Sequence, residues 1–428
     1  MTVKTDDVGA RALLGPMLDE TVPPSKVEVS RLVAAGRSRV RVRRWAGISG
    51  AGALTAVALI GGSLLVQPNQ PPAAALQTAT STAPSPATGS RPAPPAFPTS
   101  CTGRLLPVPG KTISSYISGG DPSGRYLVGG YATDTSGHRP VLWDNGNPVI
   151  IPAPGGDLVA IEVNDRGIVA GTTDKIGNGT VEQINWVYRD GRVSPLGEPA
   201  TKPGTFIQVI DINSGGDILL DSRPRTGVDP NRGPGIWTAA GQGTFRPLAD
   251  PGNLGELTAS ALDEDGTVVG RYLVGQGFEG ERTLVWKADG QLTKPSPPAG
   301  YGPGGALRLV RGGFAVGYYQ QPGKQPHEVN TVRRDLRTGI DTAIPALAGA
   351  GAVNAHGWVA GLIRESGQGQ TPAITTGTQL IKLPLPAGAI ASSDGVGAYH
   401  LSDDGRTVAG NVAVNRDYLG AAVWRCLP

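Results

Sequence analysis

From Cys101 to the end of the chain, hydrophobic and polar positions follow one pattern seven times. In each copy an apolar strand runs into an Asn-, Asp- or Ser-rich turn with glycine, and a second strand ends in small residues. Apolar runs separated by such turns predict β-hairpins. Four clear copies, among them VAIEVNDRGIVAG and YHLSDDGRTVAG, end at Gly171, Gly270, Gly361 and Gly410. Three weaker copies end at Gly129, Asp221 and Gly317.

A second mark follows each copy 14 to 16 residues later, at a position that is usually tryptophan. The seven positions are Trp143, Trp186, Trp237, Trp286, Arg333, Thr375 and Trp424, and consecutive ones lie 42 to 51 residues apart. A strand-and-turn period of this length is typical of β-propeller blades. We therefore predict an all-β, seven-bladed β-propeller over residues 101–428. The five tryptophans are expected to pack between neighbouring blades; a carbohydrate-binding platform is the alternative.

Four strands are expected in each blade. In the second repeat they are Val159–Val163, Gly167–Thr172, Glu182–Arg189 and Arg192–Leu196, the last two joined by an Asp-Gly hairpin turn. The fourth strands share a proline-bearing pattern, as in RVSPLGEP and FRPLADP. Since proline is tolerated at a sheet edge, these strands are predicted to be the outer strands of the blades.

The last repeat ends at Pro428 and leaves no room for its own fourth strand. Arg104–Pro109 (RLLPVP) carries the outer-strand pattern ahead of the first blade, so we expect it to complete the seventh blade and close the ring. Cys101 and Cys426, the only cysteines, fall at the two ends of this pairing. Outside the cytoplasm such a pair is expected to form a disulfide; two buried free thiols are the alternative.

The N-terminal part of the chain differs from the repeats. Ala46–Val66 is 21 residues without a charge, long enough for a transmembrane helix. Residues 67–100 are rich in Pro, Ala, Thr and Ser and are predicted to form a disordered extracellular linker. A signal peptide cleaved near Ala73–Ala75 is the alternative. Five arginines precede the span and place residues 1–45 in the cytoplasm; they are Arg37, Arg39, Arg41, Arg43 and Arg44.

Charge and motifs restrict the chemistry of the repeat region. The whole chain has a formal charge of +3, but residues 101–428 sum to −2, which gives no basic footprint for nucleic acid. No motif of a known nucleophile, zinc site or phosphate loop is present. Asp263–Gly266 lacks the spacing of a calcium loop and is interpreted as a hairpin turn. We therefore expect no catalytic residue, cofactor or metal ligand.

Two family resemblances follow from these motifs. The repeats resemble those of bacterial extracellular HAF-type repeat proteins, and Gly137–Trp143 (GHRPVLW) carries the closest second half. The N-terminus, through Val22–Gly36 and the arginine cluster, is similar to actinobacterial single-pass membrane proteins. Some of those accompany extracytoplasmic-function sigma factors, which implies a cytoplasmic regulator as partner. The zinc-binding His-x-x-x-Cys-x-x-Cys of zinc anti-sigma factors is absent here.

These features favour a membrane-anchored extracellular propeller that binds an envelope protein or glycan without catalysis. One alternative is a transmembrane signalling protein, in which the propeller senses a ligand and residues 1–45 bind a regulator such as a sigma factor. Another is a propeller hydrolase that acts on wall polysaccharide. In all three the expected location is the cell membrane, with the C-terminal domain outside.

Overall fold

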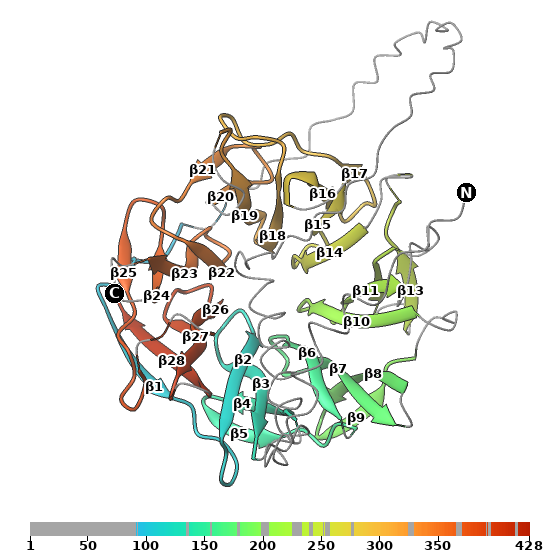
Figure 1. Cartoon of the computed structure of the whole chain (residues 1–428), viewed down its shortest axis with the longest axis vertical. Helices are drawn as coiled ribbons and strands as arrows, with labels where there is room; N and C mark the ends of the chain where they lie inside the picture. The colour runs from blue at the N-terminus through green and yellow to red at the C-terminus, as the bar shows by residue number, and fades with distance from the viewer. Residues whose placement is uncertain are drawn as a thin grey trace, which may run out of the picture. The chain divides into compact units, whose positions relative to one another are not determined.

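The chain folds into a ring of seven antiparallel sheets, seen face-on in Figure 1 of this computed structural model. The structure describes residue 91 and residues 93–428, apart from 134–136, 155, 178–179, 198–204, 225–232, 239–242, 251, 253–256, 275–277, 324–328, 365–369, 391, 393–394 and 416–417. The cytoplasmic tail (1–45), the transmembrane helix (46–66) and most of the linker that the sequence predicts lie outside the described residues. Within the described part, no helix is long and apolar enough to cross a bilayer.

Each blade has four strands, and the first lies innermost (Figure 1). Blades 1 to 3 are β2 (Ser114–Gly120), β3 (Tyr126–Ala132), β4 (Arg139–Asp144), β5 (Asn147–Ile150); β6 (Asp157–Val163), β7 (Val169–Gly177), β8 (Thr180–Arg189), β9 (Arg192–Pro195); and β10 (Thr205–Ile212), β11 (Ile218–Pro224), β12 (Gly235–Thr238), β13 (Thr244–Pro247). Blades 4 and 5 are β14 (Leu257–Leu262), β15 (Val268–Leu273), β16 (Glu281–Trp286), β17 (Leu292–Thr293); and β18 (Gly305–Arg311), β19 (Phe314–Gln320), β20 (Val329–Asp335), β21 (Asp341–Ala343). Blades 6 and 7 are β22 (Gly349–Val353), β23 (Val359–Arg364), β24 (Gln370–Thr375), β25 (Leu380–Lys382); and β26 (Gly397–Leu401), β27 (Thr407–Ala413), β28 (Leu419–Leu427), β1 (Ser100–Leu105). The seven-bladed all-β prediction is confirmed.

The seventh blade takes its outer strand from the other end of the domain. β1 pairs antiparallel with β28, with Cys101 opposite Cys426 and Arg104 opposite Val423. The predicted closing strand, Arg104–Pro109, is therefore placed in the right blade, but the paired segment begins four residues earlier and ends at Leu105. Cys101 and Cys426 form a disulfide across this pairing, 325 residues apart in sequence.

The hydrophobic core consists of seven clusters, each built from two consecutive blades. For example, Trp143 of blade 1 packs with Ala409 and Val423 of blade 7, and Trp424 of blade 7 packs with Ile374 and Leu383 of blade 6. Each interface excludes water from the apolar faces of two sheets, so every blade is stabilised by contact with its two neighbours.

The glycine that ends most repeats has a steric reason. The inner strand of every blade contains a β-bulge, for instance between Ala398 and His400 in β26. The bulge pushes a backbone carbonyl towards the second strand, where any side chain would overlap it. A Cβ at these glycines would overlap a carbonyl oxygen of the inner strand: Gly129, Gly270, Gly317, Gly361 and Gly410.

Candidate functional site

The polar residues of the repeats gather at the turn between the first and second strands of each blade, here called the AB turn. The first residue of the turn caps its own loop. Asn164 Oδ1 accepts from the amides of Arg166 and Ile168, and Asn354 Oδ1 does the same for His356 and Trp358. Because these side-chain oxygens bind backbone amides, the turns are structural, as the sequence predicts.

Hydrogen bonds also join the AB turns of neighbouring blades. Asp263 of blade 4 accepts from the amides of Gly312 and Gly313 of blade 5, both at 2.7 Å. The Asn164 side chain donates to the carbonyl of Asn213 at 3.1 Å, from blade 2 to blade 3. Such bonds satisfy backbone groups that each blade would otherwise bury without a partner. The AB turns therefore form one connected face.

Arg311 at the end of β18 joins three blades at this face. Its guanidinium pairs with Glu264 of blade 4 and with Asp403 of blade 7, where Nη2 and Oδ2 lie 3.0 Å apart. Burial alone would lower the pKa of Arg311, but the charges of Asp403 and Glu264 outweigh it and raise that pKa. Glu264 also accepts from the amide of Ser214, and Asp403 from that of Ala355. The first strands of the blades surround the centre of the ring, here called the channel (Figure 1). The cluster Arg311, Glu264 and Asp403 lies where three of these strands end and is called the channel tie below.

Two acidic residues stand next to the channel tie on the inner strands of blades 2 and 3. Burial raises the pKa of Asp211 to about 7, even though its carboxylate accepts from the amides of Ile212 and Leu262. Burial also raises the pKa of Glu162 well above its usual value, and the charge of Asp211 adds to this. Gly119, with no side chain, leaves room for the Glu162 carboxylate. Near neutral pH Asp211 is therefore partly protonated.

His400 occupies the corresponding position of blade 7. Its side chain lies against Gly120, the residue is only 7% exposed, and burial lowers its pKa to about 4. The imidazole is therefore neutral at physiological pH, despite the nearby charges of Asp121 and Asp403. A histidine held neutral by burial contributes packing rather than charge.

These channel residues were not singled out from the sequence. The sequence feature that could have identified them is a residue that departs from the repeat, two positions before the AB turn. Blades 1, 4 and 6 have small residues there (Gly119, Ala261 and Ala352), whereas blades 2, 3 and 7 have Glu162, Asp211 and His400. Among the described residues, no group of three metal-binding side chains comes together.

The predicted tryptophans lie at blade interfaces. Trp143, Trp186, Trp286 and Trp424 are fully buried, and Trp237 is partly buried against blade 2. Three indole N–H groups donate to carbonyls that follow the outer strand of the preceding blade: Trp143 to Pro107, Trp286 to Ala249 and Trp424 to Pro384, at 2.7–2.8 Å. Trp186 instead donates to Thr173 of its own blade. The four fully buried rings fill the interfaces between blades.

The two irregular repeats use other contacts at this position. Arg333 of blade 5 donates to the carbonyls of Gly357 and Thr376 in blade 6, at 2.5 and 3.0 Å. Thr375 of blade 6 bonds to the carbonyl of Gln379 in its own turn at 2.6 Å. The predicted arginine cluster at residues 37–44 lies outside the described residues.

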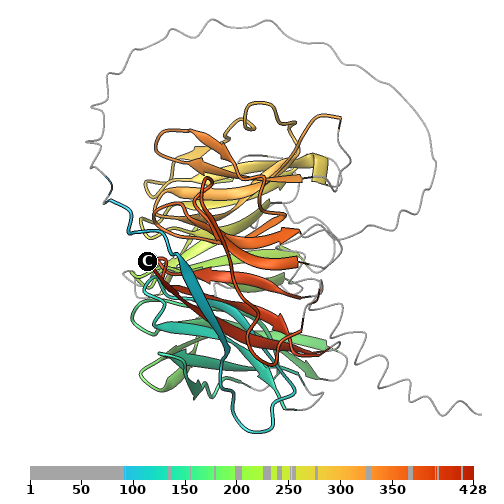
Figure 2. The ribbon, with the colours of Figure 1, turned by 90° about the vertical axis from the view of Figure 1, so that its left-hand side faces the viewer.

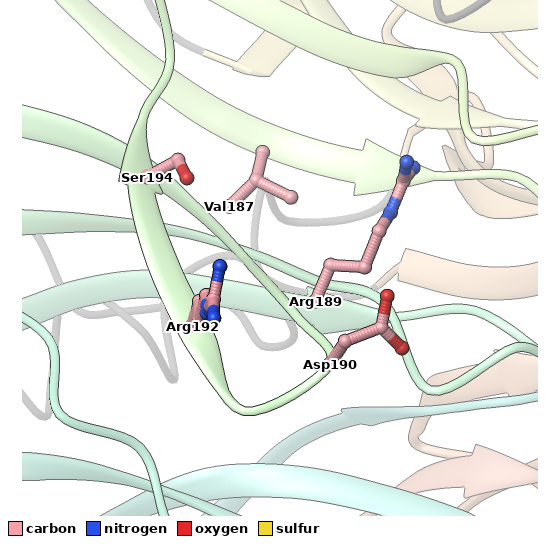
Figure 3. A pocket seen from close by; sticks show the side chains of 5 residues that line it. All are labelled: Val187, Arg189, Asp190, Arg192 and Ser194. Carbon is pink, nitrogen blue, oxygen red and sulfur yellow. The ribbon is translucent and has the colours of Figure 1, made fainter.

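A cavity of about 550 Å³ lies away from the channel, on the hairpin of β8 and β9 (Figure 3). Its lining consists of Val187, Arg189, Asp190, Arg192 and Ser194. All five belong to one hairpin at the outer edge of blade 2, so the cavity does not bring together groups from different blades. The channel tie and its neighbours, drawn from five blades, are the better candidate for a site.

Comparisons with known proteins extend to the fold and no further. No protein-family model matches the chain, and no curated protein sequence matches it. Solved structures with a similar fold include virginiamycin B lyase from Staphylococcus aureus (15% identity, 77% of this chain and 99% of that one, TM-score 0.47). Others are the β-propeller domain of the trilobed protease from Pyrococcus furiosus (11%, 73% and 95%, 0.47) and TolB from Acinetobacter baumannii (13%, 74% and 68%, 0.40). At such scores the likenesses carry no argument about activity.

Proposed function

We propose that this protein is a membrane-anchored extracellular β-propeller that binds an envelope protein or glycan and catalyses no reaction. The observation that carries the proposal is the hydrogen bonding of the acidic side chains around the channel. Asp211, Asp263, Glu264 and Asp403 each accept a hydrogen bond from a backbone amide of a neighbouring blade. Carboxylates held in this way stabilise the ring and are poorly placed to move protons to and from a substrate.

The way the ring is closed supports the same proposal. A β-strand and a disulfide join residues 325 positions apart, so the blades are fixed relative to one another. Loops on such a rigid frame lose little conformational entropy on binding, which favours recognition. The disulfide also fits an oxidising compartment outside the cytoplasm.

The two alternatives make different demands on the molecule. A signalling protein needs a partner for residues 1–45, which lie outside the described residues. A hydrolase needs an acid and a base that face a substrate, whereas Asp211 and His400 are committed to the ring by hydrogen bonding and by burial. The binding module requires neither, which is why we place it first.

The test is to incubate the full chain with isolated cell-wall and membrane fractions and to follow both retention and product release. The proposal expects saturable retention with no soluble fragment set free. A chain that ends at Ser100, with the N-terminal segments but no propeller, is the control and should not be retained by the wall fraction. Release of wall fragments that scales with protein concentration and time would identify a hydrolase and overturn the proposal.

A further inference from the structure

The residues just before the propeller lie on its surface. Arg91 and residues 93–99, here called the strap, run from blade 5 past blade 6 to the seam of blade 7, on the same side as the C-terminus (Figure 2). This is the AB-turn face, because the Cys426 amide beside the C-terminus donates to Arg406 of the seventh AB turn. The sequence predicts a disordered linker up to Ser100, whereas the described part of the chain begins at Arg91.

The first anchor of the strap is Arg91 on blade 5. Its guanidinium lies 3.6 Å from the centre of the Phe314 ring and pairs with Asp335 at 2.8 Å. A further hydrogen bond of 3.0 Å goes to the carbonyl of Gly312. Both charged side chains are about four-fifths buried, at 21% and 20% exposure. A cation over an aromatic face with a paired carboxylate is a specific arginine site, unlike a solvated surface pair.

Asp335 is held in its charged form at this site. Burial alone would raise its pKa, but the amide of Arg337 and the guanidinium of Arg91 together hold it below the usual value. Removing Arg91 would therefore leave a carboxylate that is largely shielded from water and has lost its counter-ion.

The second anchor is aromatic. Phe97 meets the ring of Trp358 in blade 6 edge to face, with ring centres 5.2 Å apart. The amide of Thr99 then donates to the carbonyl of Leu427 at 2.8 Å, where β1 begins. The sequence from Arg91 to Thr99, RPAPPAFPT, has four prolines. Proline favours an extended polyproline II backbone that loses little entropy on docking, as in recognition of proline-rich peptides by aromatic surfaces.

The irregular fifth repeat explains why this site is on blade 5. Its AB turn is shortened to Gly312-Gly313, and Arg333 replaces the phased tryptophan. Arg333 lies 5.5 Å from the centre of the Phe314 ring and bonds to Gly357 of blade 6. A side chain at Gly357 would come as near as 3.0 Å to the same ring, so Phe314 is packed closely against blade 6. Arg91 lies over this ring as well.

We propose that blades 5 and 6 carry a binding surface for an arginine-bearing, proline-rich segment, and that the strap of the same chain is its occupant. The surface consists of Gly312, Phe314, Asp335 and Trp358. A segment of this composition on another molecule reaches it only when the strap leaves. Since Gly312 follows Arg311 in the same turn, the strap docks directly on the turn that carries the channel tie. This inference does not depend on the proposed envelope ligand.

The affinity of the strap for the surface on blades 5 and 6 has a lower bound. A segment tethered by a short linker has an effective concentration on the order of 1 mM, so a strap that is mostly docked needs a dissociation constant of about 1 mM or less as a free peptide. The free peptide should therefore bind measurably once the strap is displaced, and it should compete poorly with a strap that is in place.

The test uses the full chain and a fluorescent peptide with the sequence of residues 91–99. In the double variant Arg91→Ala, Phe97→Ala the surface is vacated, and the peptide should bind with a dissociation constant of about 1 mM or below, at least about two-fold more tightly than to the wild type. Adding Asp335→Asn to the double variant should weaken binding at least ten-fold. A peptide with alanine in place of its arginine should bind the double variant at least ten-fold more weakly than the original peptide does.

Circular dichroism establishes that the variants are folded, and Arg91→Ala alone serves if the double variant is not. Saturable binding that needs both a vacated surface and Asp335 supports the inference. No saturation of the folded, vacated variant at 10 mM peptide, about ten times the effective concentration, overturns it. Equal binding to wild type and vacated variant, or no effect of Asp335→Asn, overturns it as well, because the peptide would then bind elsewhere.

Discussion

Arg311 of blade 5 donates a 3.0 Å hydrogen bond to Asp403 of blade 7 and so bypasses blade 6, which lies between them in the ring. The same guanidinium holds Glu264 of blade 4. The core clusters of the described residues join neighbouring blades, whereas the channel tie also joins blades that are not neighbours. It links the AB turns of blades 4, 5 and 7 directly.

Replacing Arg311 by methionine should lower the free energy of unfolding by about 2–3 kcal/mol, because two partly buried carboxylates lose their shared counter-ion. Urea unfolding at pH 7 measures it. Arg125→Met is the matched control: it removes the exposed pair of Arg125 and Asp144, with side chains 52% and 36% exposed, and should leave the free energy of unfolding almost unchanged. Equal losses in the two variants would show that the channel tie does not stabilise the ring.

Asp211 should make the propeller less stable as pH rises through neutrality. Its pKa is about 7 in the folded protein against a usual 3.8, so the folded state binds more protons than the unfolded state between these values. This stabilisation is fully present below pH 4 and is lost as pH rises through 7. Asp211→Asn keeps the oxygen that accepts from Leu262 but cannot ionise.

Relative to wild type, Asp211→Asn should therefore gain stability between pH 4 and pH 8, by about 2 kcal/mol after allowance for partial exposure. Unfolding curves of both proteins at the two pH values give this difference. The neighbouring Glu162 has a raised pKa of the same origin, so Glu162→Gln should shift the profile in the same direction. A wild-type-minus-variant difference that does not change with pH would contradict the assignment.

The sequence contains most of the information about the ring, because blade spacing, turns and outer-strand prolines all recur. Even the exchange of strands between the chain's ends follows from counting, since the last repeat lacks a fourth strand that Arg104–Pro109 supplies. The bounds were less accurate. β7 begins at Val169 rather than Gly167 and runs on to Gly177, because pairing with β8, not hydrophobicity, decides where it ends.

The channel residues could not be predicted in the same way. Glu162, Asp211 and His400 stand where blades 1, 4 and 6 have small residues, and each departure by itself is ordinary variation in a turn-flanking position. Their grouping depends on ring closure and on the β-bulges, neither of which leaves a sequence period. The strap could not be predicted for another reason. Its proline-rich composition is that of a linker, and Arg91 forms its hydrogen bonds with residues more than 200 positions away in the sequence.

Gly410 should be among the least replaceable residues of the chain. In Gly410→Ala the new Cβ would overlap the carbonyl of Gly397 on the bulged inner strand, and backbone cannot move aside as a side chain can. We expect a loss of at least about 3 kcal/mol, or a chain that fails to fold. Thermal unfolding measures it. Gly197→Ala is the control, since its Cβ would meet only Trp237 at an ordinary contact distance of 3.4 Å; similar losses in both would refute the steric account.

The disulfide should stabilise the ring by restricting the unfolded chain. For a loop of 325 residues the chain-entropy relation gives about 6 kcal/mol as a ceiling, and about 2–5 kcal/mol is expected for Cys101→Ser, Cys426→Ser. Denaturant unfolding of this variant and of the oxidised wild type gives the difference. Adding reductant should bring the wild type to the level of the variant and leave the variant unchanged; a reductant effect on the variant would point to another cause.

The central claim is that the chain closes its own ring, with β1 in the seventh blade, in a compartment that oxidises thiols. The most direct measurement is non-reducing peptide mapping of the full chain, isolated from its native cells after free thiols have been blocked. We predict a single cross-linked peptide that joins Cys101 to Cys426, with no blocked thiol at either position. Blocked, unpaired thiols at both cysteines in folded protein from the cell surface would contradict the account.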